Sequence, residues 1–261
     1  MQVPDNLYSV IFMGTYLVII WVFLIKLIIQ NIKGGKLKAR DAAWKWNFLA
    51  YFLLGFGDLF HLGFRIYIFI AGYGPDDHFT NLFIGLGYII SGLTMTYFYI
   101  AVFHGWAKTY GTTYSTPKKI KLYTVIIYIA FILRFILMML PYNRWYEGDA
   151  TVDFGFDFRI ITAIPLYIIG ILAVFLLFSH SRAEAKDLKG IDPIRNKGNF
   201  YASIWFLVSY ITYTITLLLV AIYPLTGLFM IPKTIAYLIA FFYHYKTMLN
   251  RPIDIDTNKK E

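Results

Sequence analysis

Three titratable side chains interrupt one of the most apolar stretches of the chain. Asp58, His61 and Arg65 lie within Gly57-Asp58-Leu59-Phe60-His61-Leu62-Gly63-Phe64-Arg65. At about 100° per residue of a helix, Asp58 and Arg65 point within about 20° of each other and His61 lies about 60° to one side, so all three share one face. A carboxylate one turn from a histidine fixes the imidazole tautomer and makes it more basic. The spacing therefore predicts His61 as a general base and Asp58 as the residue that orients it.

Two more cations, Arg134 and Lys233, lie within other apolar runs. Counted at about 1.5 Å per residue from the basic ends of their helices, they reach nearly the depth of His61, about 17–21 Å along. A charge inside a bilayer costs about 3 kcal/mol or more unless it faces a cavity or a partner. Because one carboxylate cannot neutralise three cations, this layer predicts an anionic ligand, which arginine can bind in a bidentate manner. The predicted ligand-binding residues are Arg65, Arg134, Lys233, Tyr210, Tyr213 and Thr94.

An alternative interpretation gives the same charges a structural role. Asp58 would pair with Arg134 or Lys233 and lock two helices together, as polar residues between membrane helices often do. That pairing leaves two cations without a counter-charge in a low dielectric, which is unfavourable. The sequence favours the functional interpretation and leaves the structural one open.

The elements that position these residues are predicted to be membrane-spanning helices. Of the 261 residues, 59% are hydrophobic and 15% are charged, whereas soluble chains carry about 45–50% and about 25%. A bilayer core of about 30 Å needs about 20 mostly apolar residues in a helix. We therefore predict an all-α integral membrane protein, a seven-transmembrane helix bundle that forms one domain over residues 1–261. The predicted spans are residues 7–31, 47–72, 82–106, 122–142, 160–180, 200–223 and 227–246.

The basic residues predict how the bundle is oriented. Lysine and arginine gather in the loops after the first, third and fifth spans and after the last one, whereas the other loops hold only Arg144 and Arg159. Because short loops rich in Lys and Arg stay in the cytoplasm, the N-terminus is predicted outside and the C-terminus inside a plasma membrane. The net charge of +9 then follows from this topology and from contact with anionic membrane lipids, and it requires no nucleic acid.

The residue types also exclude several chemistries. The chain has no cysteine, which removes disulfides, thiol nucleophiles and cysteine-ligated metals. Zinc needs more ligands than Asp58 and His61, which alone lie at a suitable depth, so neither a metal nor a cofactor is predicted. His104, His180 and His244 fall near the basic ends of their spans. We expect these three histidines to be interfacial anchors.

An internal similarity suggests a repeat. A shift of 152 residues aligns Lys45-Trp46-Asn47-Phe48-Leu49-Ala50 with Lys197-Gly198-Asn199-Phe200-Tyr201-Ala202. This register pairs the first two spans with the fifth and sixth, which suggests two parallel three-helix units joined by the fourth span, although chance similarity between apolar helices is the alternative. The layout resembles that of sugar carriers and cargo receptors with a three-plus-one-plus-three arrangement, and the resemblance implies transport. The Pro-Gln pair of many such proteins is absent.

A second resemblance is confined to about one and a half helices. Gly57-Asp58, followed by Phe83-Ile84-Gly85-Leu86-Gly87-Tyr88, is similar to the lysoplasmalogenase-like membrane family, which carries Gly-Asp at the centre of a span. The resemblance implies an enzyme. The second acidic motif of that family would fall near Ser209-Tyr210, where this chain has no acidic residue.

These observations predict a hydrolase or transferase that acts on a lipid or another anionic amphiphile. His61 would be the base, Asp58 would orient it, and the cations would hold the head group. Two alternatives stay open, a carrier of a small anion or amphiphile and a sensor that passes ligand binding to a cytoplasmic partner.

Overall fold

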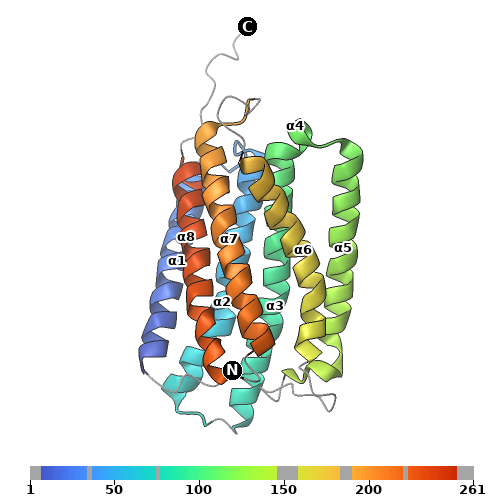
Figure 1. Ribbon diagram of the computed structural model, residues 1–261. Helices are drawn as coiled ribbons and strands as arrows, with labels where there is room; N and C mark the ends of the chain where they lie inside the picture. Colours follow the sequence, from blue (N-terminus) through green and yellow to red (C-terminus); the bar gives the residue numbers. More distant parts are fainter. Residues whose placement is uncertain are drawn as a thin grey trace.

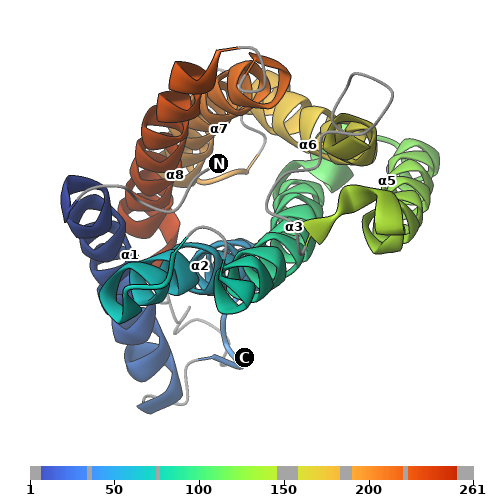
Figure 2. The same ribbon diagram turned by 90° about the horizontal axis from the view of Figure 1, so that it is seen from below.

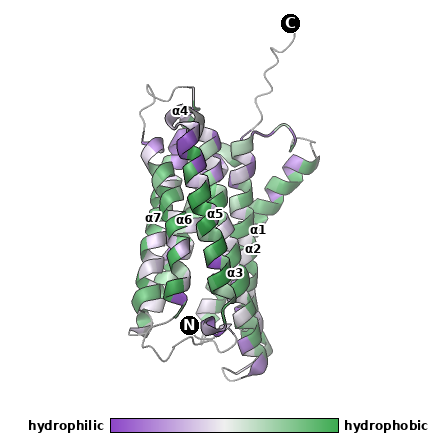
Figure 3. Cartoon of the chain, turned by 90° about the vertical axis from the view of Figure 1, so that its right-hand side faces the viewer, coloured by the Kyte–Doolittle hydropathy of each residue, from purple (hydrophilic) through white to green (hydrophobic). Residues whose placement is uncertain are grey.

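The computed structural model describes residues 7–33, 37–74, 77–145, 158–182, 190–219 and 223–251. Within these residues seven helices are long and apolar enough to cross a membrane, which confirms the predicted number of spans. They run side by side, with hydrophobic residues along their middles and hydrophilic residues mainly near their ends (Figures 1 and 3). The elements are α1 (Leu7–Lys33), α2 (Ala42–Ala71), α3 (His78–Trp106), η1 (Ala107–Gly111), α4 (Thr112–Tyr114), α5 (Pro117–Met139), η2 (Pro141–Asn143), α6 (Phe158–Ser181), α7 (Pro193–Leu219), η5 (Pro224–Phe229), α8 (Met230–His244) and η6 (Tyr245–Leu249).

Several helices begin earlier than the predicted spans, because side-chain caps start them ahead of the membrane-length segments. Helix α2 begins at Ala42 and not at residue 47, since the Asp41 carboxylate accepts a hydrogen bond of 2.6 Å from the backbone N–H of Trp44. Thr116 caps α5 in the same way. Such caps satisfy backbone donors that the first turn leaves unpaired, and they allow hydrophilic residues to start a helix.

Six of these long helices form a ring, and α5 stands outside it beside α3 and α6 (Figure 2). On one side α2 packs against both α1 and α3, and on the other α7 packs against both α6 and α8. We call α1–α3 the first arc and α6–α8 the second arc. The arcs meet where α3 packs against α6, and where Phe23 of α1 lies edge-to-face on Phe241 and Phe242 of α8.

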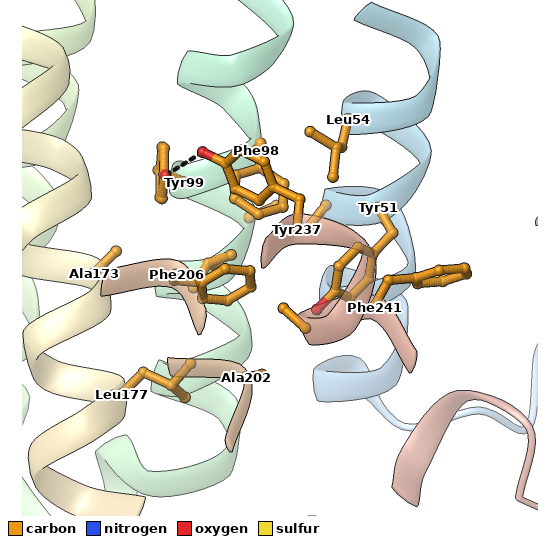
Figure 4. Close-up of a cluster of buried hydrophobic side chains, with 14 of the residues drawn as sticks. Tyr51, Leu54, Phe98, Tyr99, Ala173, Leu177, Ala202, Phe206, Tyr237 and Phe241 are labelled. Carbon is orange, nitrogen blue, oxygen red and sulfur yellow. Dashed lines mark hydrogen bonds between the residues drawn. The ribbon is translucent and has the colours of Figure 1, made fainter. Parts of the chain in front are cut away.

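The two ends of the ring are packed differently. At the end where α2, α5 and α7 begin, which we call the basic end, aromatic side chains from both arcs fill the interior (Figure 4). Phe98 of α3 lies 5.4 Å from Phe206 of α7, and Tyr51 of α2 lies 4.8 Å from Phe241 of α8, measured between ring centroids. Many such ring contacts, each weak by itself, hold the two arcs together at this end by close packing.

Glycines bring helices of the second arc into close contact. A Cβ atom on Gly170 of α6 would collide with the ring and hydroxyl group of Tyr210 of α7. The same relation joins Gly57 of α2 to Thr94 of α3 in the first arc. Helix pairs in membranes commonly use small residues in this way, because a missing side chain lets the backbones approach.

Replacing Gly170 with alanine is expected to destabilise the folded protein by about 1–3 kcal/mol, the usual effect of overpacking a filled interior. The measurement is thermal unfolding of the purified protein in detergent. Gly63→Ala is the matched control, because nothing lies within 4 Å of a Cβ atom at Gly63 in the same type of helix. Equal unfolding temperatures for the two variants would contradict the close α6–α7 contact.

Candidate functional site

A cavity of about 170 Å³ lies inside the ring at the end opposite the basic end. Its wall is formed by residues of α2, α3, α5, α6, α7 and α8. We call this end of the ring the cavity end. Four basic side chains line it, whereas its described lining contains no aspartate or glutamate. The basic residues are His61, Arg134, Arg159 and Lys233, and the aromatic residues are Tyr88, Tyr99, Trp145, Tyr210, Tyr213 and Tyr237. The wall is therefore cationic and rich in aromatic rings.

Arg134 of α5 reaches into this cavity from outside the ring. Its side chain is 6% exposed, its Nε donates to the Thr96 hydroxyl over 2.8 Å, and its Nη1 donates to the Thr162 carbonyl oxygen over 2.6 Å. Its Nη2 lies 3.6 Å from where a Cβ on Gly92 would stand, beside the cavity. No carboxylate of the described chain pairs with this guanidinium, so a buried positive charge is held in place by neutral oxygens alone.

Lys233 of α8 lies in the cavity wall with its ammonium 4.7 Å from the ring centroid of Tyr213. The ring face carries partial negative charge, which favours a cation there. Lys233 also attracts Asp58 electrostatically, yet the two groups form no direct ion pair within the described residues. Lys233 and Arg134 thus both contribute positive charge to the lining without a carboxylate in contact.

Asp58, predicted to orient His61, forms no hydrogen bond with it among the described contacts. Asp58 instead accepts a hydrogen bond of 2.5 Å from the Tyr16 hydroxyl group of α1. His61 lines the cavity, with its ring 5.3 Å from that of Tyr88. The reason is the rotation of α2, which turns Asp58 toward α1 and leaves His61 facing the ring interior. His61 therefore lacks the orienting carboxylate that a general base was expected to have.

Two other predicted site residues lie outside the cavity lining. Arg65 donates to the Tyr88 hydroxyl group over 3.2 Å and lies over that ring, so it contacts a residue of the cavity wall. Thr94 donates to backbone carbonyls of its own helix and packs against Gly57, at the contact between α2 and α3. Thr96, two residues further along α3, is the threonine that binds Arg134.

Hydroxyl groups form the floor of the cavity. Tyr99 of α3 and Tyr237 of α8 share a hydrogen bond of 2.6 Å, drawn as the dashed line in Figure 4. Tyr210 of α7, a predicted site residue, stacks at a tilt on Tyr99 with centroids 5.0 Å apart and donates to the Leu166 carbonyl oxygen over 3.1 Å. Tyrosines therefore separate the cavity from the aromatic packing at the basic end.

No protein-family model, curated protein or solved structure matches this chain. Its function is therefore inferred from the geometry of the cavity. Among the described residues, no three His, Asp or Glu side chains come together as metal ligands. The lining instead combines cations, hydroxyl groups and apolar surface, which suits the binding of a small anion that carries an apolar part.

Sequence patterns missed two residues of this architecture. Arg159 of α6 lines the cavity and lies 5.1 Å from the Tyr88 ring centroid, although its position beside a loop suggested only a topology marker. The available signal was that Arg159 lies near the start of α6, at the same end of the bundle as the end of α2 that carries Arg65. His244 was expected to be an interfacial anchor, and this is wrong, because the side chain is fully buried and its Nδ1 lies 2.8 Å from the Tyr51 hydroxyl group.

Proposed function

We propose that the chain is a multi-pass membrane protein with its N-terminus outside and its C-terminus in the cytoplasm of a plasma membrane. The seven long apolar helices and the gathering of Lys and Arg at the basic end support this topology. In this orientation the cavity end faces the outside and the basic end contacts anionic lipid at the inner surface.

We further propose that the cavity binds a small organic anion, a carboxylate or phosphate monoester with an aromatic or apolar part. The observation that carries this proposal is Arg134, a buried guanidinium at the cavity wall whose partners are uncharged oxygens. A buried charge without a counter-ion is unfavourable, and an anion beside Nη2 relieves that imbalance. Lys233 adds a second positive charge, while the tyrosine rings and Met95 offer surface for the apolar part.

Binding is better supported than hydrolysis or group transfer. Catalysis by His61 needs a group that fixes its tautomer, and Asp58, the carboxylate one turn away on α2, is engaged by Tyr16. The described lining also offers no cysteine, and no serine bonded to a histidine, as a nucleophile. A hydrolase remains the second candidate, supported by the presence of His61 in a cationic wall. Loss of turnover in His61→Ala with unchanged ligand affinity would favour that candidate.

The two arcs are proposed to be related units of a pseudo-repeat. In each arc the middle helix packs against both of its neighbours, α2 in the first and α7 in the second, and α5 connects the arcs from outside the ring. The similarity between Lys45–Ala50 and Lys197–Ala202 falls at the start of these two middle helices.

The proposal predicts that purified protein binds benzoate or phenyl phosphate but not benzyl alcohol, which has the same ring without the charge. Trp145 lies in the lining, so quenching of tryptophan fluorescence is a direct measurement, and calorimetry checks it. Mass spectrometry of molecules retained through gentle purification searches for the natural anion. Equal binding of benzyl alcohol, or binding of no anion together with nothing retained, would overturn the proposed function.

A further inference from the structure

The hydrogen bonds at the basic end join one arc to the other at successive levels. Nearest the cavity, Tyr99 pairs with Tyr237, and one level further Tyr51 pairs with His244. Next, the Trp44 indole donates to the Leu249 carbonyl oxygen over 3.0 Å. Each of these bonds connects α2 or α3 of the first arc with α8 or η6 at the end of the second.

Polar contacts at the outermost level of the basic end also connect the arcs. The Tyr110 hydroxyl group, just after α3, donates to the Asn196 side chain over 2.7 Å and accepts from Asn199 over 2.9 Å, both on α7. Arg195 of α7 forms a 2.5 Å ion pair with Asp41, the cap of α2. The basic end is therefore closed by contacts between the arcs from the cavity floor to the last helical turn.

The Tyr237 hydroxyl group, at the cavity floor, also donates to Met95 Sδ of α3 over 3.5 Å, and beyond this level the described hydrogen bonds between long helices of the ring lie within one arc. Tyr16 of α1 donates to Asp58 of α2, and Arg65 of α2 donates to Tyr88 of α3, all in the first arc. In the second arc, Tyr167 of α6 donates to Thr214 of α7 over 3.0 Å. Across the arcs, the Arg159 guanidinium of α6 lies over the Tyr88 ring of α3, on the side where α3 packs against α6.

From this asymmetry we infer that the chain carries its anion across the membrane by alternating access, and that the contacts between arcs at the basic end are its closed inner gate. The two arcs rock as units about the contact of α3 with α6, so that opening the basic end closes the cavity end. The identity of the cargo rests on the proposed anion site, whereas the motion of the arcs is inferred from the contacts between them alone.

The position of Arg134 connects the cargo to this motion. Its Nε is held by α3 of the first arc and its Nη1 by α6 of the second, while α5 itself stands outside the ring. An anion bound at the guanidinium therefore lies at the contact about which the arcs move. A ligand shifts a conformational equilibrium only if it binds the two states unequally, and a residue shared by both arcs provides such a difference.

The contacts of the inner gate are individually weak enough to break when the basic end opens. The Arg195–Asp41 pair is partly exposed, with 24% and 50% of the two side chains accessible, and pairs of that kind contribute little to stability. The other bonds use single hydroxyl, amide or indole groups. Tyr51→Phe and Tyr110→Phe each remove a hydroxyl group and keep the ring, whereas Trp44→Phe removes the indole N–H and leaves a smaller aromatic ring.

Cysteine labelling tests the inference without any ligand, because the chain has no cysteine of its own. Ser91→Cys places a thiol in the cavity wall, and a membrane-impermeant maleimide is applied from either side of vesicles of known orientation. We expect labelling from the cavity side in the parent protein. Adding Tyr51→Phe and Tyr110→Phe is expected to raise labelling from the basic side by about fivefold or more and to lower labelling from the cavity side.

Matched controls distinguish a rocking motion of the two arcs from a general loosening of the helix packing. Tyr167→Phe removes a tyrosine hydrogen bond within the second arc and is expected to leave both labelling rates unchanged. Lys118→Cys, exposed at the basic end, reports access of the reagent to that side. Where the double variant does not fold, Arg195→Gln opens only the exposed ion pair and is expected to change the rates in the same directions by a smaller factor.

The outcomes are distinct. Reciprocal changes in the two labelling rates support alternating access. Folded gate variants labelled only from the cavity side, or a rise from both sides at once, would overturn it. Absence of benzoate and phenyl phosphate binding together with reciprocal labelling would overturn the proposed cargo and leave the motion standing, whereas anion binding with one-sided labelling would do the reverse.

Discussion

Replacing Arg134 with methionine is expected to weaken the binding of benzoate or phenyl phosphate by roughly 10- to 100-fold. The expectation follows from the value of a hydrogen bond to a charged group, about 1.5–3 kcal/mol, together with about 1.4 kcal/mol for each tenfold change in affinity. The same variant is expected to be at least as stable as the parent without ligand. Methionine removes a buried charge that no described carboxylate pairs with, and buried charges are often replaced by apolar side chains without loss of stability.

Affinity is measured by calorimetry and stability by thermal unfolding on the same preparation, so that loss of the site and loss of the fold are separated. Lys26→Met is the control, because it removes one positive charge from α1 at a residue outside the cavity lining. Thr96→Val removes the partner of Nε and keeps the charge, so a smaller loss of affinity is expected. An Arg134→Met protein that binds benzoate as tightly as the parent, or that unfolds at a much lower temperature, would show that Arg134 is structural.

Hydropathy and charge patterns were sufficient to predict the number of long helices and the depth of His61, Arg134 and Lys233 along them. Residues His61, Arg134 and Lys233, on three separate helices, line one cavity because equal distances along antiparallel helices bring side chains to one level. These distances along the helices were calculated from the rise per residue and from the positions of the basic loops alone. The starts of α2 and α7 were missed because each is set by an aspartate side chain, Asp41 accepting from the Trp44 N–H and Asp192 from the Ile194 N–H, and a hydropathy average does not register such contacts.

The sequence pattern could not predict how each helix is rotated about its own axis. Asp58 and His61 share a face within the angular tolerance of a helix, yet the Tyr16 hydroxyl group draws Asp58 to α1, and only the packing of α1 on α2 decides this. Thr94 and Thr96 differ by two residues and hence point to different neighbours, one to Gly57 and the other to Arg134. A pattern that ranks residues by depth alone cannot separate them.

Neutralising Asp58 is expected to have the opposite effect to neutralising Arg134. Asp58 attracts Lys233 electrostatically and repels any anion in the cavity, so Asp58→Asn removes a competitor and a repulsion together. Two unit charges about 10 Å apart interact by about 1.7 kcal/mol in an effective dielectric of about 20, which corresponds to roughly a tenfold gain in affinity. Asparagine retains an oxygen that can accept from Tyr16, so the contact between α1 and α2 is expected to persist.

The ligand-free Asp58→Asn protein is expected to unfold at a lower temperature, because Lys233 loses its counter-charge, and a saturating anion is expected to reverse this loss. Thermal unfolding with and without benzoate measures both effects. Asp77→Asn is the matched control: Asp77 caps α3 outside the cavity lining, and asparagine caps a helix about as well. An Asp58→Asn protein with unchanged or weaker benzoate binding would mean that the anion does not approach Lys233, and the binding site would then have to centre on Arg134 alone.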